Sequence, residues 1–213
     1  MTRNRVLRGV ALSAAALIGA TALVAAPAAN AAGTNSLASV LGVGKAAFDT
    51  NGKDYDIVTK AAEAVLAAKP KSAVALLADG KTALTAFIPN DRAFEILASQ
   101  LSGKTVTDEE AAFGVVAGLG IDTVETVLLY HVVPGKAILA SSALKANGAK
   151  LQTAVDGKVI RVKVTSAPAI ILGDYAPTLA NPRVILTQTN INKGNMQVAH
   201  GINRVLLPIN PAA

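Results

Sequence analysis

Residue types that commonly carry out chemistry are sparse in this chain. It contains two histidines, His131 and His200, and no cysteine. Neither histidine belongs to an H-E-x-x-H pattern, and a zinc site takes three or four nitrogen, sulfur or oxygen ligands. The adjacent acids Asp108, Glu109 and Glu110 open a predicted helix, where their interaction with the helix dipole accounts for them. We therefore predict no metal site and no cofactor.

Short matches to nucleotide-binding and hydrolase motifs lack the surroundings that these chemistries need. Residues 42–47 fit G-x-G-x-x-A, but no strand precedes them, as a dinucleotide site would require. The Gly-Lys-Thr sequences at 80–82 and 103–105 lack the first glycine of a phosphate-binding loop. Residues 142–145 fit S-x-x-K without its companion motifs. Because no nucleophile and base can be paired, we predict that the protein is not an enzyme.

Residues 1–31 are typical of a secretory signal peptide. Three arginines and no acid precede an apolar run at 10–26, and Ala29-Asn30-Ala31 then provides a small-residue cleavage site. The alternative is an uncleaved membrane anchor, because the run approaches the length of a short span. Its small residues and the cleavage site favour removal. We predict a secreted protein, extracellular or loosely associated with the cell surface, with no membrane span after cleavage.

The charge and composition of the mature chain argue against a nucleic-acid partner. Loss of three arginines lowers the formal net charge from +6 to +3, and the remaining lysines and arginines are scattered singly along the sequence. Nucleic-acid binding favours a clustered basic face and aromatic side chains for stacking. Aromatic residues make up only 3% of the chain, and there is no tryptophan. The lack of cysteine also means that the apolar core must stabilise the domain without disulfides.

Hydrophobic periodicity predicts helices in the first part of the mature chain and strands in the second. A loose leader at 32–53, with a short helix at 37–41, precedes the domain. Predicted helices cover 54–69, 72–78, 90–101, 107–116 and 122–131, with capping boxes at Thr107 and Asp122. Predicted strands cover 82–88, 150–155, 158–164, 169–172, 184–187 and 202–206, with an Asp156-Gly157 hairpin turn. This order predicts one α+β domain with a mostly antiparallel sheet.

Three blocks, in order, resemble the fasciclin-like domain. They are TAFIPNDRAF at 85–94, LLYHVVPG at 128–135 and VAHGINRVLLP at 198–208. The resemblance covers about residues 54–209, nearly the whole mature chain. It implies an α+β fold: a wedge-shaped β-sandwich of about seven strands with the N-terminal helices packed against it. It also implies an extracellular or surface-associated module for adhesion or protein contact, without a general catalytic activity.

Several departures and loops define the candidate binding residues. Asn203 stands where the family usually has aspartate, and Asn190-Ile191 aligns loosely with an Asp-Ile pair linked to adhesion in some members. We interpret Tyr130 and His131 as structural residues. The alternative is that they contact a partner. Tyr175 is the sole aromatic residue in a Gly-, Pro- and Asn-rich segment at 173–195. The alternatives for this segment are an ordinary solvated loop pair and a contact surface distinct from Tyr130 and His131, with Tyr175 as its anchor. The candidate binding residues are therefore Tyr130, His131, Tyr175, Asn190 and Ile191.

Two functions fit these observations. The first is an adhesion or protein-interaction module whose partner is an extracellular or cell-surface protein or matrix component. The second is an extracellular small-molecule or lipid-binding protein with an apolar groove between helices and sheet. A secreted hydrolase is a third and weaker reading.

Overall fold

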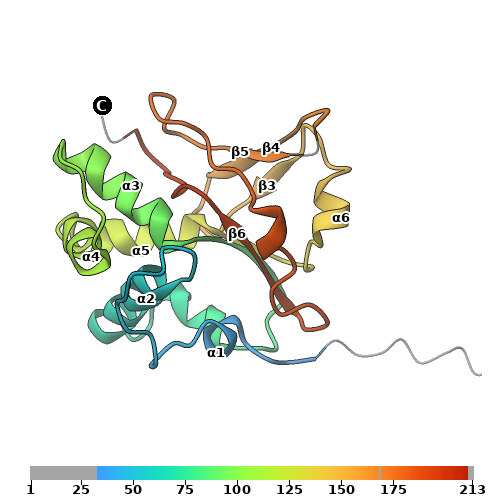
Figure 1. Ribbon diagram of the computed structural model, residues 1–213. Coiled ribbons are helices and arrows are strands. Elements are labelled where there is room, and N and C mark those ends of the chain that lie inside the picture. The colour runs from blue at the N-terminus through green and yellow to red at the C-terminus, as the bar shows by residue number, and fades with distance from the viewer. Residues whose placement is uncertain (1–32, 168, 211–213) are drawn as a thin grey trace, which may run out of the picture. The chain divides into compact units, whose positions relative to one another are not determined.

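The computed structural model describes residues 33–167 and 169–210, all of which belong to one compact unit, Ala32–Ala213. The predicted signal peptide and its cleavage site lie outside the described residues. Figure 1 shows two strands, β1 and β6, running through the centre of the unit, with helices α2 to α5 on one side and strands β3 to β5 on the other.

The central sheet joins segments from distant parts of the chain. Its order is β2 (Val132–Pro134), β1 (Leu84–Pro89), β6 (Gln197–Ile202). Strand β1 is antiparallel to β2 but parallel to β6, which is the one parallel pair among the four strand pairs of the described residues, so the predicted mostly antiparallel pairing holds except here. Every residue of β1 and β6 is buried, which suits a parallel pair covered on both faces. The last strand therefore lies several residues earlier than the predicted 202–206.

The second sheet follows the sequence prediction closely. It is an antiparallel meander of β3 (Lys150–Gln152), β4 (Val159–Val164) and β5 (Ile170–Gly173). The turn between the first two contains Asp156 and Gly157, and Gly157 has a φ of 69°, which glycine adopts without strain. The strand predicted at 184–187 is absent, because Val184 makes only an isolated bridge and a 3₁₀ helix follows. The described residues thus contain six strands in two sheets rather than about seven.

The helices begin largely where polar side chains cap them. Asn90 accepts a hydrogen bond from the Ala93 N–H (3.0 Å), as predicted. Two predicted capping boxes were wrong: Asp108 caps α4 in place of Thr107, and α5 begins after Gly120 without a side-chain cap. The helices are α1 (Leu37–Val40), α2 (Asp56–Ala68), α3 (Asp91–Ser102), α4 (Glu109–Ala117), α5 (Ile121–Tyr130) and α6 (Ala140–Ala143), with 3₁₀ helices η1 (Ala73–Ala78) and η2 (Leu186–Gln188).

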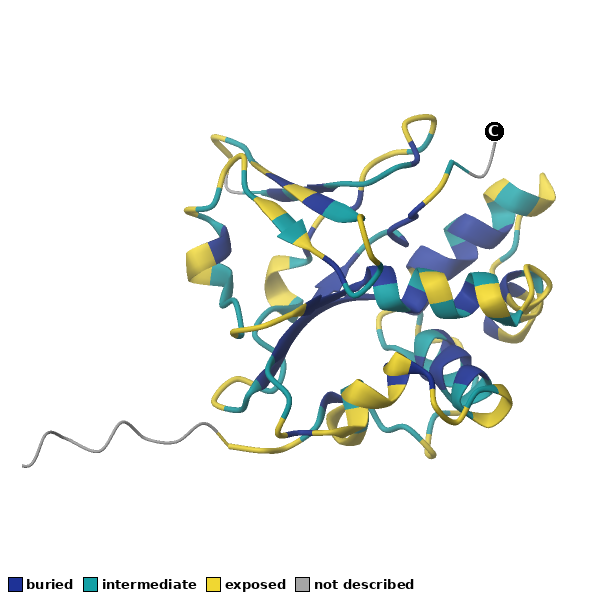
Figure 2. Cartoon of the chain, turned by 180° about the vertical axis from the view of Figure 1, so that it is seen from behind, coloured by how far each residue is buried: buried dark blue, intermediate teal, exposed yellow. Residues whose placement is uncertain are grey.

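The apolar core has three clusters, one on each side of the central sheet and one among the helices. Strand β1 divides its side chains by alternation: Phe87 faces the second sheet, whereas Ala86 and Ile88 face α1. Figure 2 shows these central strands as buried throughout, with helices that are buried on one side only. Leu37 in α1 is fully buried, so part of the expected loose leader is packed into the domain.

No single helix among residues 33–167 and 169–210 is long and apolar enough to cross a membrane. Helices α4 and α5 would reach that length and hydropathy only together, and the chain bends by 107° between them.

Candidate interaction surface

Tyr130 and His131 hold the end of α5 in the core. Tyr130 is fully buried, and its hydroxyl donates a hydrogen bond to the Val159 carbonyl oxygen (2.9 Å). His131 Nδ1 donates to the Val127 carbonyl oxygen (2.7 Å), and its Nε2 accepts from the Leu206 N–H (2.9 Å). Burial lowers the pKa of His131 to about 4, which keeps the ring neutral. Both side chains are therefore engaged inside the domain, as the structural interpretation expected.

His200, Asn190 and Ile191 form a second internal connection. His200 Nε2 donates to the Ile138 carbonyl oxygen (2.8 Å), and burial lowers the pKa of this histidine. Asn190 adopts a left-handed φ of 57°, and its Oδ1 accepts from the Ala140 N–H (2.9 Å). Ile191 forms an isolated bridge to Ala199 and is partly buried. The Asn190-Ile191 pair thus fixes the loop before β6 to the segment around α6.

Tyr175 lies where the second sheet meets the core, half-buried rather than fully exposed. Its ring packs edge-on against Tyr130, with 6.1 Å between the centroids, so the expectation of a surface distinct from Tyr130 was wrong. Two cations lie over the ring: Lys158 Nζ is 4.3 Å from the centroid, and the Arg161 guanidinium carbon is 5.5 Å away. The negative face of an aromatic ring attracts such cations. Tyr175 therefore anchors basic side chains at the edge of the sheet.

The outer face of the second sheet is basic. Strand alternation buries Ile160 and Val162 and leaves Arg161 and Lys163 exposed on the opposite face. Two more cations lie on the same face through strand pairing. Lys150 of β3 lies directly opposite Arg161, and Arg183 is bridged to Ile171, the β5 residue that lies opposite Lys163. We define the basic face as the cations on this side of the sheet together with Lys158, which lies over Tyr175 beside Arg161. Its members are Lys150, Lys158, Arg161, Lys163 and Arg183.

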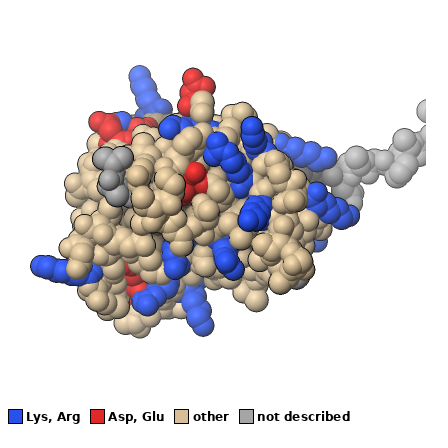
Figure 3. All heavy atoms as spheres, turned by 90° about the horizontal axis from the view of Figure 1, so that it is seen from above, with Lys and Arg blue, Asp and Glu red and all other residues tan. Residues whose placement is uncertain are grey.

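None of these five cations is in an ion pair within the described part of the chain, where the ion pairs use Lys60, Lys69 and Arg92. Asp174, beside Tyr175, instead accepts hydrogen bonds from the Ala176 and Leu207 N–H groups (both 3.0 Å). Figure 3 looks down on this side of the unit, where lysine and arginine side chains stand out with few acids among them. The expectation of singly scattered cations was wrong for this face, since sheet pairing gathers residues that are separate in the sequence.

An apolar cavity of about 80 Å³ lies between the N-terminal helices and the central sheet. Leu41, Val58 and Leu77 line it on the helical side, and Ala86 and Ile88 of β1 line it on the other. A cavity of roughly 150 Å³ can bind benzene, so this one matches only a smaller apolar group as it stands.

The geometry defines an α+β domain with two small sheets, buried polar side chains that connect its elements, and one basic outer face. The sequence profile of the fasciclin domain matches residues 58–208. The chain belongs to the fasciclin domain family, whose members generally act in adhesion and protein interaction and are typically extracellular or at the cell surface.

One similar solved structure is a FAS1 domain pair from the insect cell adhesion molecule fasciclin I. It is 15% identical to this chain, with a TM-score of 0.44 over 71% of the chain. The match spans 43% of the length of that structure. A search of curated proteins found no match.

Proposed function

We propose that this protein is a secreted, non-catalytic adhesion or protein-interaction module that binds an acidic extracellular or cell-surface protein or matrix component through its basic face. The observation that carries the proposal is the row of cations on the basic face, none of which has an acidic partner among residues 33–167 and 169–210. Lys150 and Arg161 lie directly opposite each other across β3 and β4. Like charges in that position destabilise a sheet, so an acidic partner would relieve a repulsion that folding leaves in place.

Tyr175 gives this surface an amphipathic anchor. Tyrosine and arginine are enriched among residues that dominate binding energy, and here they lie within cation–π distance of one another. The neutral asparagines at 190 and 203 are hydrogen-bonded to the protein backbone, which leaves the basic face as the charged element of recognition. Nucleic acid is not the proposed partner, because aromatic residues for base stacking are only 3% of the chain.

Charge reversal tests the proposal. The double variant Arg161→Glu, Lys163→Glu should weaken retention on the producing cells by about tenfold or more, because it turns attraction into repulsion at exposed positions. The matched control is Lys81→Glu, Lys104→Glu, which makes the same charge change at two exposed lysines outside the basic face. Retention is measured by quantifying bound and released protein, and melting curves verify that both variants fold. Equal retention of the two double variants would overturn the proposal.

The apolar cavity supports a second candidate function, that of an extracellular small-molecule or lipid-binding protein. Organic extraction of the purified protein followed by mass spectrometry measures any ligand carried from the producing cells. A single apolar compound in stoichiometric amount would favour this second function. Its absence, together with loss of retention after charge reversal, would favour the interaction module.

The proposal also requires export. We predict that the protein recovered from culture supernatant begins at Ala32, because Ala29-Asn30-Ala31 follows the apolar run as a cleavage site. Intact-mass measurement checks the N-terminus. A mass that retains the first 31 residues, or protein found only in the membrane fraction, would contradict it.

A further inference from the structure

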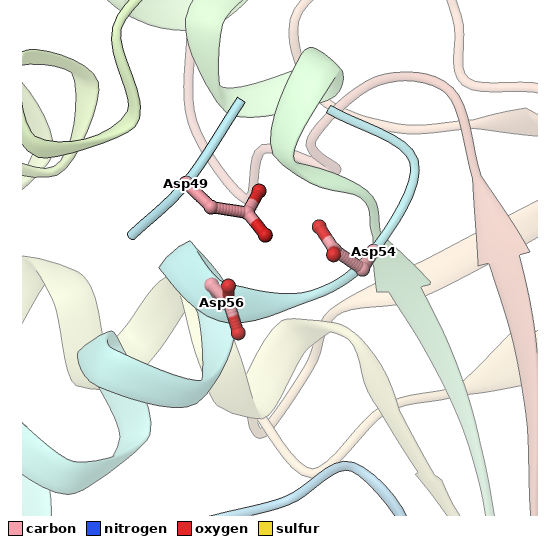
Figure 4. Close-up of side chains that lie close together, drawn as sticks. All are labelled: Asp49, Asp54 and Asp56. Atoms are coloured by element: carbon pink, nitrogen blue, oxygen red, sulfur yellow. The ribbon is translucent and has the colours of Figure 1, made fainter. Parts of the chain in front are cut away.

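The loop before α2 and the first residue of that helix bring together three carboxylates. One carboxylate oxygen from each of Asp49, Asp54 and Asp56 lies within 4.8 Å of the others. Figure 4 shows the carboxyl groups of Asp49 and Asp54 turned toward each other, with Asp56 close beneath them. Asn51 fixes the loop from within, since its Nδ2 donates to Asp54 Oδ2 (2.7 Å) and its N–H to Asp49 Oδ1 (2.6 Å).

A second group of carboxylates continues this one into the interior. Asp54 is shared, and one oxygen from each of Asp54, Asp91 and Glu109 again lies within 4.8 Å of the others. Asp91 and Glu109 come from the first turns of α3 and α4, and they are 0% and 1% exposed. Glu109 lies in the first turn of α4, as predicted, but the helix dipole does not account for it fully, because its side chain is buried among acids.

Two oxygens of this inner group have no partner. Glu109 Oε2 accepts a hydrogen bond from the Asp49 N–H (2.8 Å), yet Glu109 Oε1 is buried without a hydrogen bond among the described residues. Asp54 Oδ1 is buried and unpaired in the same way. An unsatisfied buried carboxylate oxygen is costly, and native structures normally provide it with a hydrogen bond or a cation.

The backbone holds the cluster in place. The Asp91 N–H donates to the Asp54 carbonyl oxygen (3.1 Å), and the Arg92 N–H donates to the Gly52 carbonyl oxygen (2.9 Å). Asp91 in turn caps α2, because its two oxygens accept from the Asp56 (3.1 Å) and Ile57 (2.8 Å) N–H groups. The loop, α2 and α3 therefore fix the carboxylates relative to one another before any ligand binds.

The oxygen separations match a calcium ion. Calcium binds oxygen ligands at about 2.3–2.6 Å, so two oxygens on one ion lie at most about 5 Å apart, and separations within 4.8 Å are compatible with this limit. The donors are all hard oxygens, which excludes the sulfur and imidazole chemistry that favours transition metals. We propose that the carboxylates of Asp54, Asp91 and Glu109 bind one calcium ion, with Asp49 and Asp56 adding negative charge on its outer side.

The competing explanation is a proton in place of the ion. Burial raises the pKa of Asp91 to about 8, and a shared proton between Asp91 and Asp54 would also lower the repulsion. A proton leaves the protein indifferent to calcium, whereas a calcium site couples stability to its concentration. Calcium dependence at constant neutral pH therefore separates the two explanations.

The experiment uses the mature protein after treatment with a chelator. Calorimetric titration with CaCl₂ should give one-site binding with a Kd of about 10⁻⁴–10⁻³ M, the range of extracellular calcium modules. At a calcium concentration about 100 times the Kd, the melting temperature should rise by roughly 5–10 °C. Sodium chloride at the same ionic strength should leave the melting temperature unchanged.

Two variants locate the site, and one serves as a matched control. Glu109→Gln and Asp54→Asn should each abolish the calcium-dependent rise. Glu110→Gln should preserve it, because this neighbouring glutamate is exposed and lies outside the cluster. Wild-type protein that neither binds calcium by calorimetry nor changes its melting temperature overturns the proposal, whatever the variants do. A calcium-dependent rise in melting temperature that persists in both Glu109→Gln and Asp54→Asn also overturns the proposal. The basic face plays no part in these measurements, so their outcome is independent of the proposed function.

Discussion

Replacing Gln197 by leucine is expected to lower the free energy of unfolding by about 3–5 kcal/mol, because each buried polar group left without its partner costs about 1–3 kcal/mol. Gln197 is fully buried at the start of β6. Its Oε1 accepts from the Leu37 N–H (2.8 Å), a group at the start of α1 with no partner inside the helix. Leucine has a similar size but can make none of these bonds.

The donor side of Gln197 connects a second segment. Its Nε2 lies 2.7 Å from the Leu76 carbonyl oxygen, 2.9 Å from that of Asp79 and 3.2 Å from that of Thr82. One amide thus ties β6 to both α1 and the η1 turn. Gln197→Glu keeps the acceptor but removes both hydrogens and directs negative charge at these carbonyls, so we expect it to destabilise the domain as well.

Denaturant unfolding measures both Gln197 variants against a surface control. Gln152→Leu changes an exposed glutamine of β3 and should remain within about 0.5 kcal/mol of the wild type. A Gln197→Leu protein as stable as this control would show that water replaces the lost bonds. A Gln197→Glu protein of wild-type stability would show that the three carbonyl contacts contribute nothing.

Local elements were predictable because their determinants lie close together in the sequence. Asn90 follows the strand-ending Pro89 and caps α3 through the Ala93 N–H, three residues away. Asp156-Gly157 sets the β3–β4 hairpin through one glycine at positive φ. Such signals need no knowledge of the rest of the chain.

The pairing of the central strands was not predictable from these local signals. Strand β1 lies among the helices in sequence, yet its parallel neighbour β6 comes near the end of the chain. An apolar run such as Leu84–Pro89 indicates a strand buried on both faces, but it does not indicate which distant segment pairs with it. The role of Gln197 was likewise not predictable, because its partners at 37, 76, 79 and 82 are brought to it by the fold.

The two charged clusters were missed for the same physical reason. The basic face depends on cross-strand register, which places Lys150 opposite Arg161 although a turn separates them in the chain. The carboxylate cluster joins Asp54, Asp91 and Glu109 at no recognisable spacing. One signal was available: Arg161 and Lys163 alternate with apolar Ile160 and Val162, a pattern that places both cations on one exposed face.

Histidine 131 should make the stability of the domain depend on pH in a defined window. Its ring is buried and neutral in the folded state, with a pKa of about 4 against an ordinary value of about 6.5. Between these values the unfolded chain binds a proton that the folded chain does not. The contribution of His131 is therefore complete above about pH 6.5 and falls by about 3 kcal/mol as the pH drops to 4, below which it levels off. Burial also lowers the pKa of His200, which acts in the same direction.

The variant His131→Gln isolates this contribution, because glutamine can both donate and accept but does not titrate. It should cost stability at neutral pH, where the fitted imidazole bonds to Val127 and Leu206 are lost. The deficit should then shrink as the pH falls from about 6.5 to 4, since only the wild type loses stability through this group. The quantity to measure is the difference in unfolding free energy between the two proteins across that range. Other titrating groups, such as Asp91, contribute equally to the pH dependence of both proteins, so their contributions cancel in the difference. A difference that stays constant with pH would show that His131 takes up its proton in the folded state at the same pH as in the unfolded chain, which contradicts a pKa lowered by burial.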